Sequence, residues 1–514
     1  MNEHLLDAFQ HVFCDPQVLL IILATSAYGV FMGAVPGLTA TMAVALLIPV
    51  TFFLDPIPAL AAVVTLEACA IFAGDLPNTL LRIPGTPSSA AYADDAYALT
   101  RSGRSAEALG TCLTFSVAGG LFGALVLMLF APQLANWARE FSAPEYFWLY
   151  LFGLSCAVVV SRGSTLQAAL ALVIGLMLST VGFSNSHTLA RFTLGQPQLY
   201  QGVNFIPAMI GLFGVSEIFR NVLVIDARAE PPAANRVATP ARGMTLFERF
   251  VARPVASVFQ AALPLLWRRK LHALRSSIIG AVVGMLPGAG ADIGAWVSLA
   301  ASKRASKQPE QYGRGSVEGI ADATAANNAA LAGAWVPALV FGIPGDSVTA
   351  IVIGVLLMKN ITPGPEIFRE QGDLVYSIYL MFFLANLVLI PVGFAAIKIG
   401  GYVVRVPRRV LLPVILLFCV IGSYAINANA FDVGIMLAMG LLGFVLERRQ
   451  IPLGPVVLGI ILGGPLEERF LQTLAKSEGS LAAFFSRPMA AALGVVCLLV
   501  WIVPAVLTIV RRGK

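Results

Sequence analysis

Glycine and small hydroxyl residues follow four Pro-Gly pairs that interrupt apolar runs of the chain. Proline within a helix removes a backbone hydrogen bond, and the freed groups need protein or water as partners at membrane depth. The broken helices point half-helix N-termini, with their partial positive charge, into the protein. Bare amides and hydroxyls at such ends suit a carboxylate ligand. The residues that we select on this basis are Pro36, Gly37, Thr39, Gly85, Thr86, Ser88, Ser89, Gly288, Gly290, Gly345, Ser347 and Thr349.

Two adjacent amides, Asn327 and Asn328, lie within an apolar helical run. Polar side chains are costly inside a membrane and usually mark a substrate or ion pathway, so we include both in the candidate site. The alternative is that they hold neighbouring helices together by hydrogen bonds. The Gly- and Ala-rich turns around them would allow close helix packing under either interpretation.

Acidic residues in or beside the apolar runs are candidates for a coupling cation. Glu67, Asp75, Glu217, Asp292 and Asp432 could each take up a proton or a sodium ion. We favour Asp75 and Asp292 because they stand close to the Pro-Gly motifs.

Composition indicates the element type that positions these residues. Of 514 residues, 58% are hydrophobic and 12% are charged, and the mean hydropathy is +0.81. A soluble domain carries about twice that charged fraction. A disordered chain, a nucleic-acid-binding protein and an ordinary cytosolic enzyme are therefore excluded, and we predict an all-α polytopic membrane protein.

The Cys and His residues give no sign of a metal site or of disulfides. The six cysteines are scattered without a Cys-x-x-Cys pair, and the four histidines share no ligand spacing. The glycines at 284–294 miss the dinucleotide fingerprint, and no phosphate-binding loop exists. We therefore expect no cofactor and no direct use of ATP.

Apolar runs long enough, or nearly long enough, to cross a bilayer divide the chain into two halves. A basic segment at 226–275 separates a first half, 1–225, from a second half, 276–514, and is expected in the cytoplasm. Counting crossings places the N-terminus outside and the C-terminus in the cytoplasm. The runs are 17–35, 38–54, 58–83, 109–131, 144–161, 165–181 and 203–225, then 276–302, 321–343, 347–358, 376–404, 410–427, 430–446, 452–465 and 488–510.

The two halves repeat each other. GAVPGLTA at 33–40 matches GMLPGAGA at 284–291, and IPGT at 83–86 matches IPGD at 343–346. The segment 276–302 fits a re-entrant hairpin that dips from the cytoplasm and turns at Pro287-Gly288. On the same topology the first hairpin enters from outside. We therefore predict two inverted-topology repeats with re-entrant or broken helices at the Pro-Gly motifs, the usual build of a secondary transporter.

Five blocks resemble the large membrane subunit of tripartite tricarboxylate transporters (TctA-like). They are GAVPGLTATMAVALLIPVTF, LLRIPGTPSSAAYADDAY, GMLPGAGADIGAW, EGIADATAANNAA and GIPGDSVTAIVIGVLLMKNITPGPEIF. They follow the family's order, and the likeness is weakest in the basic segment and the last hundred residues. The resemblance implies uptake of di- or tricarboxylates across a bacterial inner membrane, driven by a Na⁺ or H⁺ gradient. It implies two partners, a small TctB-like membrane subunit and a periplasmic TctC-like solute-binding protein. The Pro-Gly hairpins, the Ile-Pro-Gly segments and the Asn pair would form its central site.

The chain departs from the family pattern at two places. Many members carry Pro-Glu where this chain has Ala323-Thr324, and Ser where it has Asp346. The added carboxylate of Asp346 suggests a cation ligand or a proton carrier, so we group it with Asp75 and Asp292.

Two other functions stay open at this point. A membrane-embedded enzyme acting on a lipid would need a compact acid/base or metal constellation, which the sequence does not show. A passive anion channel would need no coupling residue. The expectation is a transporter that is not an enzyme.

Overall fold

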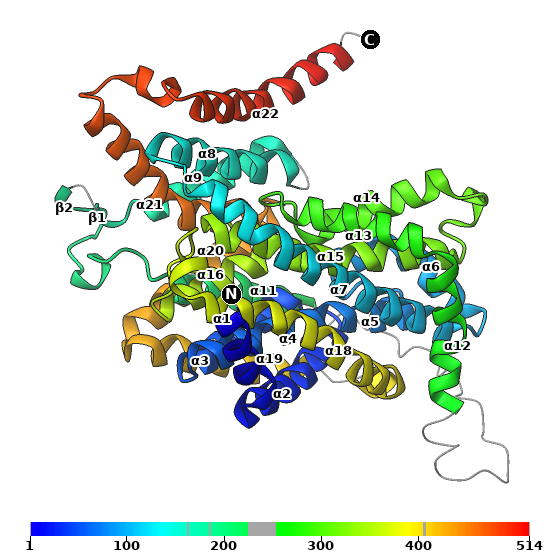
Figure 1. Cartoon of the computed structure of the whole chain (residues 1–514). Coiled ribbons are helices and arrows are strands. Elements are labelled where there is room, and N and C mark those ends of the chain that lie inside the picture. Colours follow the sequence, from blue (N-terminus) through cyan, green and yellow to red (C-terminus); the bar gives the residue numbers. More distant parts are fainter. Residues whose placement is uncertain (1, 162–163, 185–186, 225–252, 404–407, 513–514) are drawn as a thin grey trace.

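The computed structural model describes residues 2–161, 164–184, 187–224, 253–403 and 408–512, and these are almost entirely helical (Figure 1). In the first half the helices are α1 Asn2–Phe9, α2 Pro16–Ala34, α3 Ala40–Phe52, α4 Pro56–Ala73, α5 Asp75–Leu81, α6 Ala93–Arg101, α7 Ser105–Ala138, α8 Ala143–Val160, α9 Thr165–Ser179, α10 Phe205–Met209 and α11 Ser216–Val224. A short hairpin of β1 Gly182–Ser184 and β2 His187–Arg191 follows α9.

The second half continues the numbering. Its helices are α12 Arg253–Arg268, α13 Lys270–Gly284, α14 Gly290–Ala305, α15 Val317–Phe341, α16 Ser347–Met358, α17 Ile367–Glu370, α18 Gly372–Val403, α19 Arg408–Asn427, α20 Ala430–Arg448, α21 Leu453–Lys476 and α22 Pro488–Arg512. The predicted basic segment, 226–275, lies outside the described residues up to 252. From 253 onward it is α12, which packs on α7, and the start of α13.

Seven helical stretches within the described residues are long and apolar enough to cross a membrane. They include the 26-residue stretch Pro56–Leu81, which is α4 and α5 together, and the 34-residue α7. The half-length apolar helices α3 and α16 are too short to span a bilayer alone. The chain is thus an all-α polytopic membrane protein, as its composition predicted.

Both predicted Pro-Gly hairpins are present. In the second hairpin, Gly280 of α13 lies opposite Gly294 of α14, since a Cβ atom at Gly294 would be 3.5 Å from the Gly280 Cα. The turn between them contains Pro287-Gly288, as predicted. In the first hairpin the turn from α2 to α3 is closed by the Leu38 amide, which donates to the Val35 carbonyl at 3.1 Å.

The two hairpins pack in the same way on the long helix that follows them. A Cβ atom at Gly33 of α2 would lie 2.2 Å from the Ala70 carbonyl oxygen of α4. A Cβ atom at Gly284 of α13 would lie 2.3 Å from the Ala330 carbonyl oxygen of α15. Gly33 and Gly284 both stand three residues before their turn proline, and Ala70 and Ala330 both stand 13 residues before the isoleucine of their Ile-Pro-Gly motif. The sequence repeat is therefore a structural repeat.

Equivalent helices of the two repeats run in opposite directions. Helix α7 runs parallel to α15, because Gly119 meets Ala325 and Gly123 meets Ala329. Helix α18 runs antiparallel to α7, because Gly120 meets Asn386 and Gly393 meets Leu113. Since α18 also runs parallel to α4, with Gly393 against Phe72 and Gly400 against Leu76, α4 is antiparallel to its counterpart α15. The repeats are inverted.

Helices of the first half pack against helices of the second half on both sides of a central group. Helices α4, α7, α15 and α18 pack on one another in the middle of the molecule. Helices α8 and α9 of the first half pack with α21 and α22 of the second, and α10–α11 of the first half pack with α19 and α20. In Figure 1, α8, α9 and α22 lie on one side of α7 and α15, and α2, α3 and α19 lie on the other. The starts of α3, α14 and α16 lie close together, because Thr41 Oγ1 is 3.0 Å from Ser347 Oγ and a Cβ atom at Gly290 would lie 2.8 Å from the Asp346 Cβ.

Candidate functional site

A cavity of about 510 Å³ lies where the broken segments of both repeats meet. Its wall combines the starts of α3, α14 and α16 with the segment after the first Ile-Pro-Gly motif. The opposite wall comes from α11, the end of α20 and the start of α21. Of the residues predicted from sequence, those that line it are Thr39, Thr86, Ser88, Glu217, Gly288, Gly290, Asp292, Asp346 and Ser347.

The first hairpin contributes the N-terminus of α3. Thr39 caps this helix, its Oγ1 accepting from the Met42 amide at 3.1 Å. The Oγ1 of Thr41, two residues further, is 3.0 Å from the Oγ of Ser347 at the start of α16. The starts of two half-helices, one from each repeat, are therefore linked directly at the cavity wall.

The second hairpin contributes a turn that only glycine fits. Gly288 and Gly290 have φ values of +77° and +58°, in the left-handed region. A Cβ atom at Gly288 would lie 2.6 Å from the Ala157 Cα, and one at Gly290 would lie 2.8 Å from the Asp346 Cβ. The Gly288 amide donates to the Gly345 carbonyl at 2.9 Å. The hairpin tip is thus fastened to the second Ile-Pro-Gly segment.

The first Ile-Pro-Gly segment folds back onto its own helix and presents hydroxyls. The Gly85 amide donates to the Gly74 carbonyl at 3.3 Å. Thr86 Oγ1 is 2.9 Å from Ser88 Oγ, and both side chains line the cavity. Ser89 lies behind them, with its Oγ donating to the Thr86 carbonyl at 2.8 Å and accepting from the Thr86 amide at 3.2 Å. Ser89 positions the hydroxyls of the wall without reaching it.

The second Ile-Pro-Gly segment ends in a capped helix. Asp346 Oδ1 accepts from the amide and the Oγ1 of Thr349, each at 2.8 Å, and Thr349 Oγ1 in turn accepts from the Asp346 amide at 2.9 Å. This capping box satisfies the free amides of the first turn of α16. Asp346 therefore has a structural task besides the charge that it adds to the cavity.

The chain matches a protein family over most of its length. The profile of the tripartite tricarboxylate transporter TctA family aligns with residues 19–458. The chain belongs to this family. It is also 35% identical over 498 residues to an "uncharacterized 52.8 kDa protein in TAR-I ttuC' 3'region" of Agrobacterium vitis, covering 96% of this chain and 93% of that protein. No solved structure matches.

A second Agrobacterium vitis protein, described as an "uncharacterized protein in TAR-II ttuC' 3'region", is also 35% identical. That match spans 230 residues, 44% of this chain and 95% of that protein. The family profile ends at 458, before α21 is complete. All the cavity-lining residues therefore lie within the TctA region of the chain.

The remaining predicted site residues lie near the cavity or away from it. Pro36, Gly37, Gly85, Gly345 and Thr349 belong to the turns and caps behind the wall. Asp75, proposed from sequence as a coupling residue, is buried beyond the wall, where its carboxylate accepts from the Tyr92 hydroxyl.

Asn327 and Asn328 are buried in α15 and are not part of the wall. They lie in a segment on which α7 and α13 pack closely, through Gly119 against Ala325 and Gly280 against Ala326. Asn328 Nδ2 donates within its own helix, to the Thr324 carbonyl at 3.4 Å. The position suits helix packing, and a place on the substrate pathway stays a prediction.

The cavity lining contains one arginine, which was not among the residues selected from the sequence. Arg220 of α11 lines the cavity. It forms an ion pair with Glu217, and its Nη1 lies 4.0 Å from Glu447 Oε2 of α20. Arg220 stands near the end of an apolar run, where α11 packs against α20, and its half-exposed side chain reaches the cavity. The sequence feature that could have indicated Arg220 is its i, i+3 spacing from Glu217, which allows an ion pair on one face of a helix.

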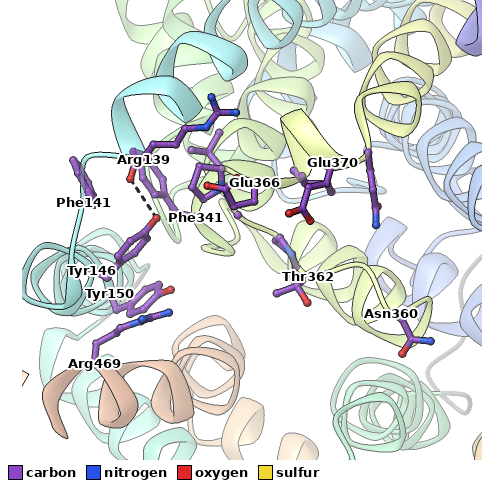
Figure 2. A pocket seen from close by; sticks show the side chains of 17 residues that line it. Arg139, Phe141, Tyr146, Tyr150, Phe341, Asn360, Thr362, Glu366, Glu370 and Arg469 are labelled. Atoms are coloured by element: carbon purple, nitrogen blue, oxygen red, sulfur yellow. Dashed lines mark hydrogen bonds between the residues drawn. The ribbon is translucent and has the colours of Figure 1, made fainter. Parts of the chain in front are cut away.

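A separate pocket of about 440 Å³ lies between the ends of α7 and α15, the first turns of α8, the segment 360–371 that contains α17, and Arg469 of α21 (Figure 2). It contains Arg139, Arg469, Glu366 and Glu370. The Arg469 guanidinium lies over the Tyr146 ring at 5.4 Å. The two pockets share no lining residue, and no residue predicted from sequence lies in this one. Because both signs of charge are present, it has no clear preference for an anion.

Proposed function

We propose that this TctA-family protein is the large membrane subunit of a secondary transporter that takes up di- or tricarboxylates by symport with Na⁺ or H⁺. Membership of the family supports a tripartite system for tricarboxylates. On that basis we infer a small TctB-like membrane subunit and a periplasmic TctC-like binding protein that delivers the substrate. The location is the bacterial inner membrane, with the N-terminus outside and the C-terminus in the cytoplasm.

The observation that carries the proposal is the make-up of the cavity wall. Half-helix starts and hydroxyls from both repeats offer donors to an anion. The cavity as a whole is lined by one arginine, Arg220, and by four acids, Glu217, Asp292, Asp346 and Glu447. An anionic substrate therefore enters a site that is already rich in negative charge. Binding becomes favourable when cations enter with it, which is the physical basis of symport.

The position of the cavity supports alternating access. One wall comes from the repeat hairpins and the other from the flanking helices α11, α20 and α21. A rigid-body movement of one wall along the other would carry the site from one membrane face to the other. Asp346, Asp292 and Asp75 remain the acids that we propose from sequence for coupling, with Asp346 and Asp292 on the wall itself.

The test is uptake into proteoliposomes that contain the full chain and its partners, which are first recovered by co-purification with the tagged chain. Radiolabelled citrate, malate and tartrate are offered with a pH gradient, a sodium gradient or neither. We expect accumulation that requires both a gradient and the binding protein. Accumulation without any gradient would contradict symport, and single-channel currents from the chain alone would favour a channel. Turnover of a lipid head group would indicate an enzyme.

A further inference from the structure

Glu67 is an acidic residue in the middle of α4 and is fully buried. Its Oε2 accepts from the indole Nε1 of Trp335 at 3.2 Å. Its Oε1 has no hydrogen-bond partner, and no Arg, Lys or His forms an ion pair with it among the described residues. A bare carboxylate costs several kcal/mol at such a depth. A proton or another cation must therefore accompany it.

The residue stands directly behind the substrate cavity. Ile71, one helical turn further along α4, lines the cavity. Gly74, the next residue on that face, contacts the first Ile-Pro-Gly segment, since a Cβ atom there would lie 2.9 Å from Thr86 Cγ2. Residues spaced i, i+4 and i+7 share a helix face.

Of the helices that pack on α4, α18 carries Asp373, Tyr376 and Lys398 and α7 carries Glu107, all toward the ends of those helices. Helices α3 and α16 have none. Tyr28 of α2, Tyr379 of α18 and Cys112 of α7 are neutral side chains at physiological pH. Asp75, in α5, is held by Tyr92. The acids of α15, Glu318 and Asp322, stand near its start and are paired with Arg269 and Arg275.

We propose that Glu67 is the binding site of the coupling proton, which deepens and rests on the transport function proposed above. A hydronium ion in the cavity gives up a proton, which forms an O–H bond at Oε1 of the ionised carboxylate and leaves a water molecule behind; release on the other side of the membrane reverses the step. An ionised Glu67 repels a carboxylate in the cavity, and protonation of Glu67 removes that repulsion. The proton and the carboxylate substrate therefore each favour the binding of the other by the same factor.

The surroundings suit a proton better than a sodium ion. Transporter sodium sites use carbonyl oxygens of unwound helix. Helix α4 is continuous from Pro56 to Ala73, so its carbonyls around Glu67 stay in the helical ladder. The indole of Trp335 occupies Oε2 as a donor. One free oxygen remains, which is enough for a proton.

The Trp335 hydrogen bond connects the proton site to the cavity wall. Trp335 belongs to α15, in the other repeat, and follows Ala334 in the chain. Gly345 lies against Ala334, since a Cβ atom at Gly345 would be 2.7 Å from the Ala334 Cβ. Asp346 comes next in the chain and lines the cavity. A change of charge on Glu67 thus acts on the segment that carries Asp346.

The test uses Glu67→Gln, which keeps the shape of the side chain and removes the proton site. The full chain with its partners is reconstituted, and labelled citrate, or whichever of malate and tartrate the wild type accumulates, is the probe. We expect accumulation driven by a pH gradient to fall by about tenfold or more, while exchange of internal for external label at equal pH stays within about twofold. The matched control is Asp432→Asn, a buried acid held by Asn204 and Asn427 away from the cavity, which should keep both activities.

The outcomes separate the two proposals. A wild-type protein that takes up none of the three carboxylates refutes the transport function. A wild type driven by sodium without any response to pH, or a Glu67→Gln variant with normal pH-driven accumulation, refutes the proton site alone. Should Glu67→Gln fail to fold, Trp335→Phe decides the matter. Loss of the indole donor should shift the pH of half-maximal accumulation, and an unchanged pH profile overturns the proposal.

Discussion

The two repeats share a backbone plan and differ in the charge of equivalent side chains. In each, a Pro-Gly hairpin packs through a glycine on a long helix, and an Ile-Pro-Gly segment folds back on that helix. At the position after Ile-Pro-Gly the first repeat has Thr86 and the second has Asp346. Sixteen residues before the isoleucine the first has Glu67 and the second has Asn327. The backbone shared by the two repeats forms the cavity, and the side chains that differ between the repeats determine where charge is placed.

Two charged side chains of opposite sign connect one repeat to the other by hydrogen bonds to backbone groups. Lys359, after α16, donates to the Phe52 and Leu54 carbonyls at the end of α3, at 2.8 and 2.5 Å. Asp95 of α6 accepts from the amides of Gly313, Gly315 and Ser316, at 2.7, 2.9 and 2.8 Å. A cation meets carbonyls on one side and an anion meets amides on the other. Each connection joins one repeat to the other.

The largest expected effect tests the shared backbone plan. Gly33→Val and Gly284→Val each place a side chain inside a helix contact where a Cβ atom would lie 2.2 or 2.3 Å from a carbonyl oxygen. Each should lower the free energy of unfolding by about 3 kcal/mol. The measurement is the midpoint of thermal unfolding of the detergent-solubilised protein. Gly434→Ala, in α20 with open space around it, is the control and should be neutral or slightly stabilising. A normal midpoint for one of the two valine variants would show that the repeats are not equivalent in packing.

The next largest effect on stability is expected from removing the Asp95 or the Lys359 connection between the repeats. Asp95→Ala leaves three amides without their acceptor and should cost about 2 kcal/mol. Lys359→Ala should lower the free energy of unfolding by less. Lys359 is only partly buried, so water can replace it as the partner of the Phe52 and Leu54 carbonyls. Thermal unfolding of both variants in the same detergent gives the order. The reverse order would mean that the cationic connection is the stronger one.

The backbone breaks could be predicted from sequence because their causes are local. Proline lacks an amide, and Gly288 adopts a φ that other residues avoid. The placement of Thr39, Thr86 and Ser347 on the cavity followed from adjacency to those breaks. Hydropathy in addition predicted the helical class, and the matched Pro-Gly motifs predicted the inverted repeat.

The surroundings of several polar residues depend on tertiary packing and could not be predicted from the sequence. Arg220 faces the cavity only because α11 packs against α20. Asn327 and Asn328 are polar residues in an apolar helix, which indicates a pathway, yet close contacts with α7 and α13 surround them. Asp75 stands near a motif and is turned toward Tyr92. In each instance the deciding fact is a partner distant in sequence.

A smaller effect separates the two tasks of Asp346. Asp346→Ala removes the cap of α16 and should cost about 1 kcal/mol, whereas Asp346→Asn keeps a capping side chain and should cost only a few tenths, about 0.3 kcal/mol. Both variants remove the charge from the cavity. If that charge contributes to coupling, the two should lose gradient-driven uptake to the same extent despite their different stability. Normal uptake by Asp346→Asn would show that Asp346 only caps α16. The charge at this position would then contribute nothing to transport, and Asp346 would be equivalent in function to the neutral Thr86 of the first repeat.

The smallest expected effect concerns the contact between the two half-helix starts. Thr41→Val and Ser347→Ala each remove one side of the hydroxyl pair that joins α3 to α16 at 3.0 Å. A double-mutant cycle of unfolding free energies should give a coupling of about 0.5–1 kcal/mol, the value of one neutral hydrogen bond. Thr25→Val, whose hydroxyl bonds the Ile21 carbonyl of its own helix, combined with Ser347→Ala should be additive. A zero coupling for the first pair would mean that the half-helices of the two repeats are held together by their Lys359 end, leaving their starts free to separate when a substrate binds.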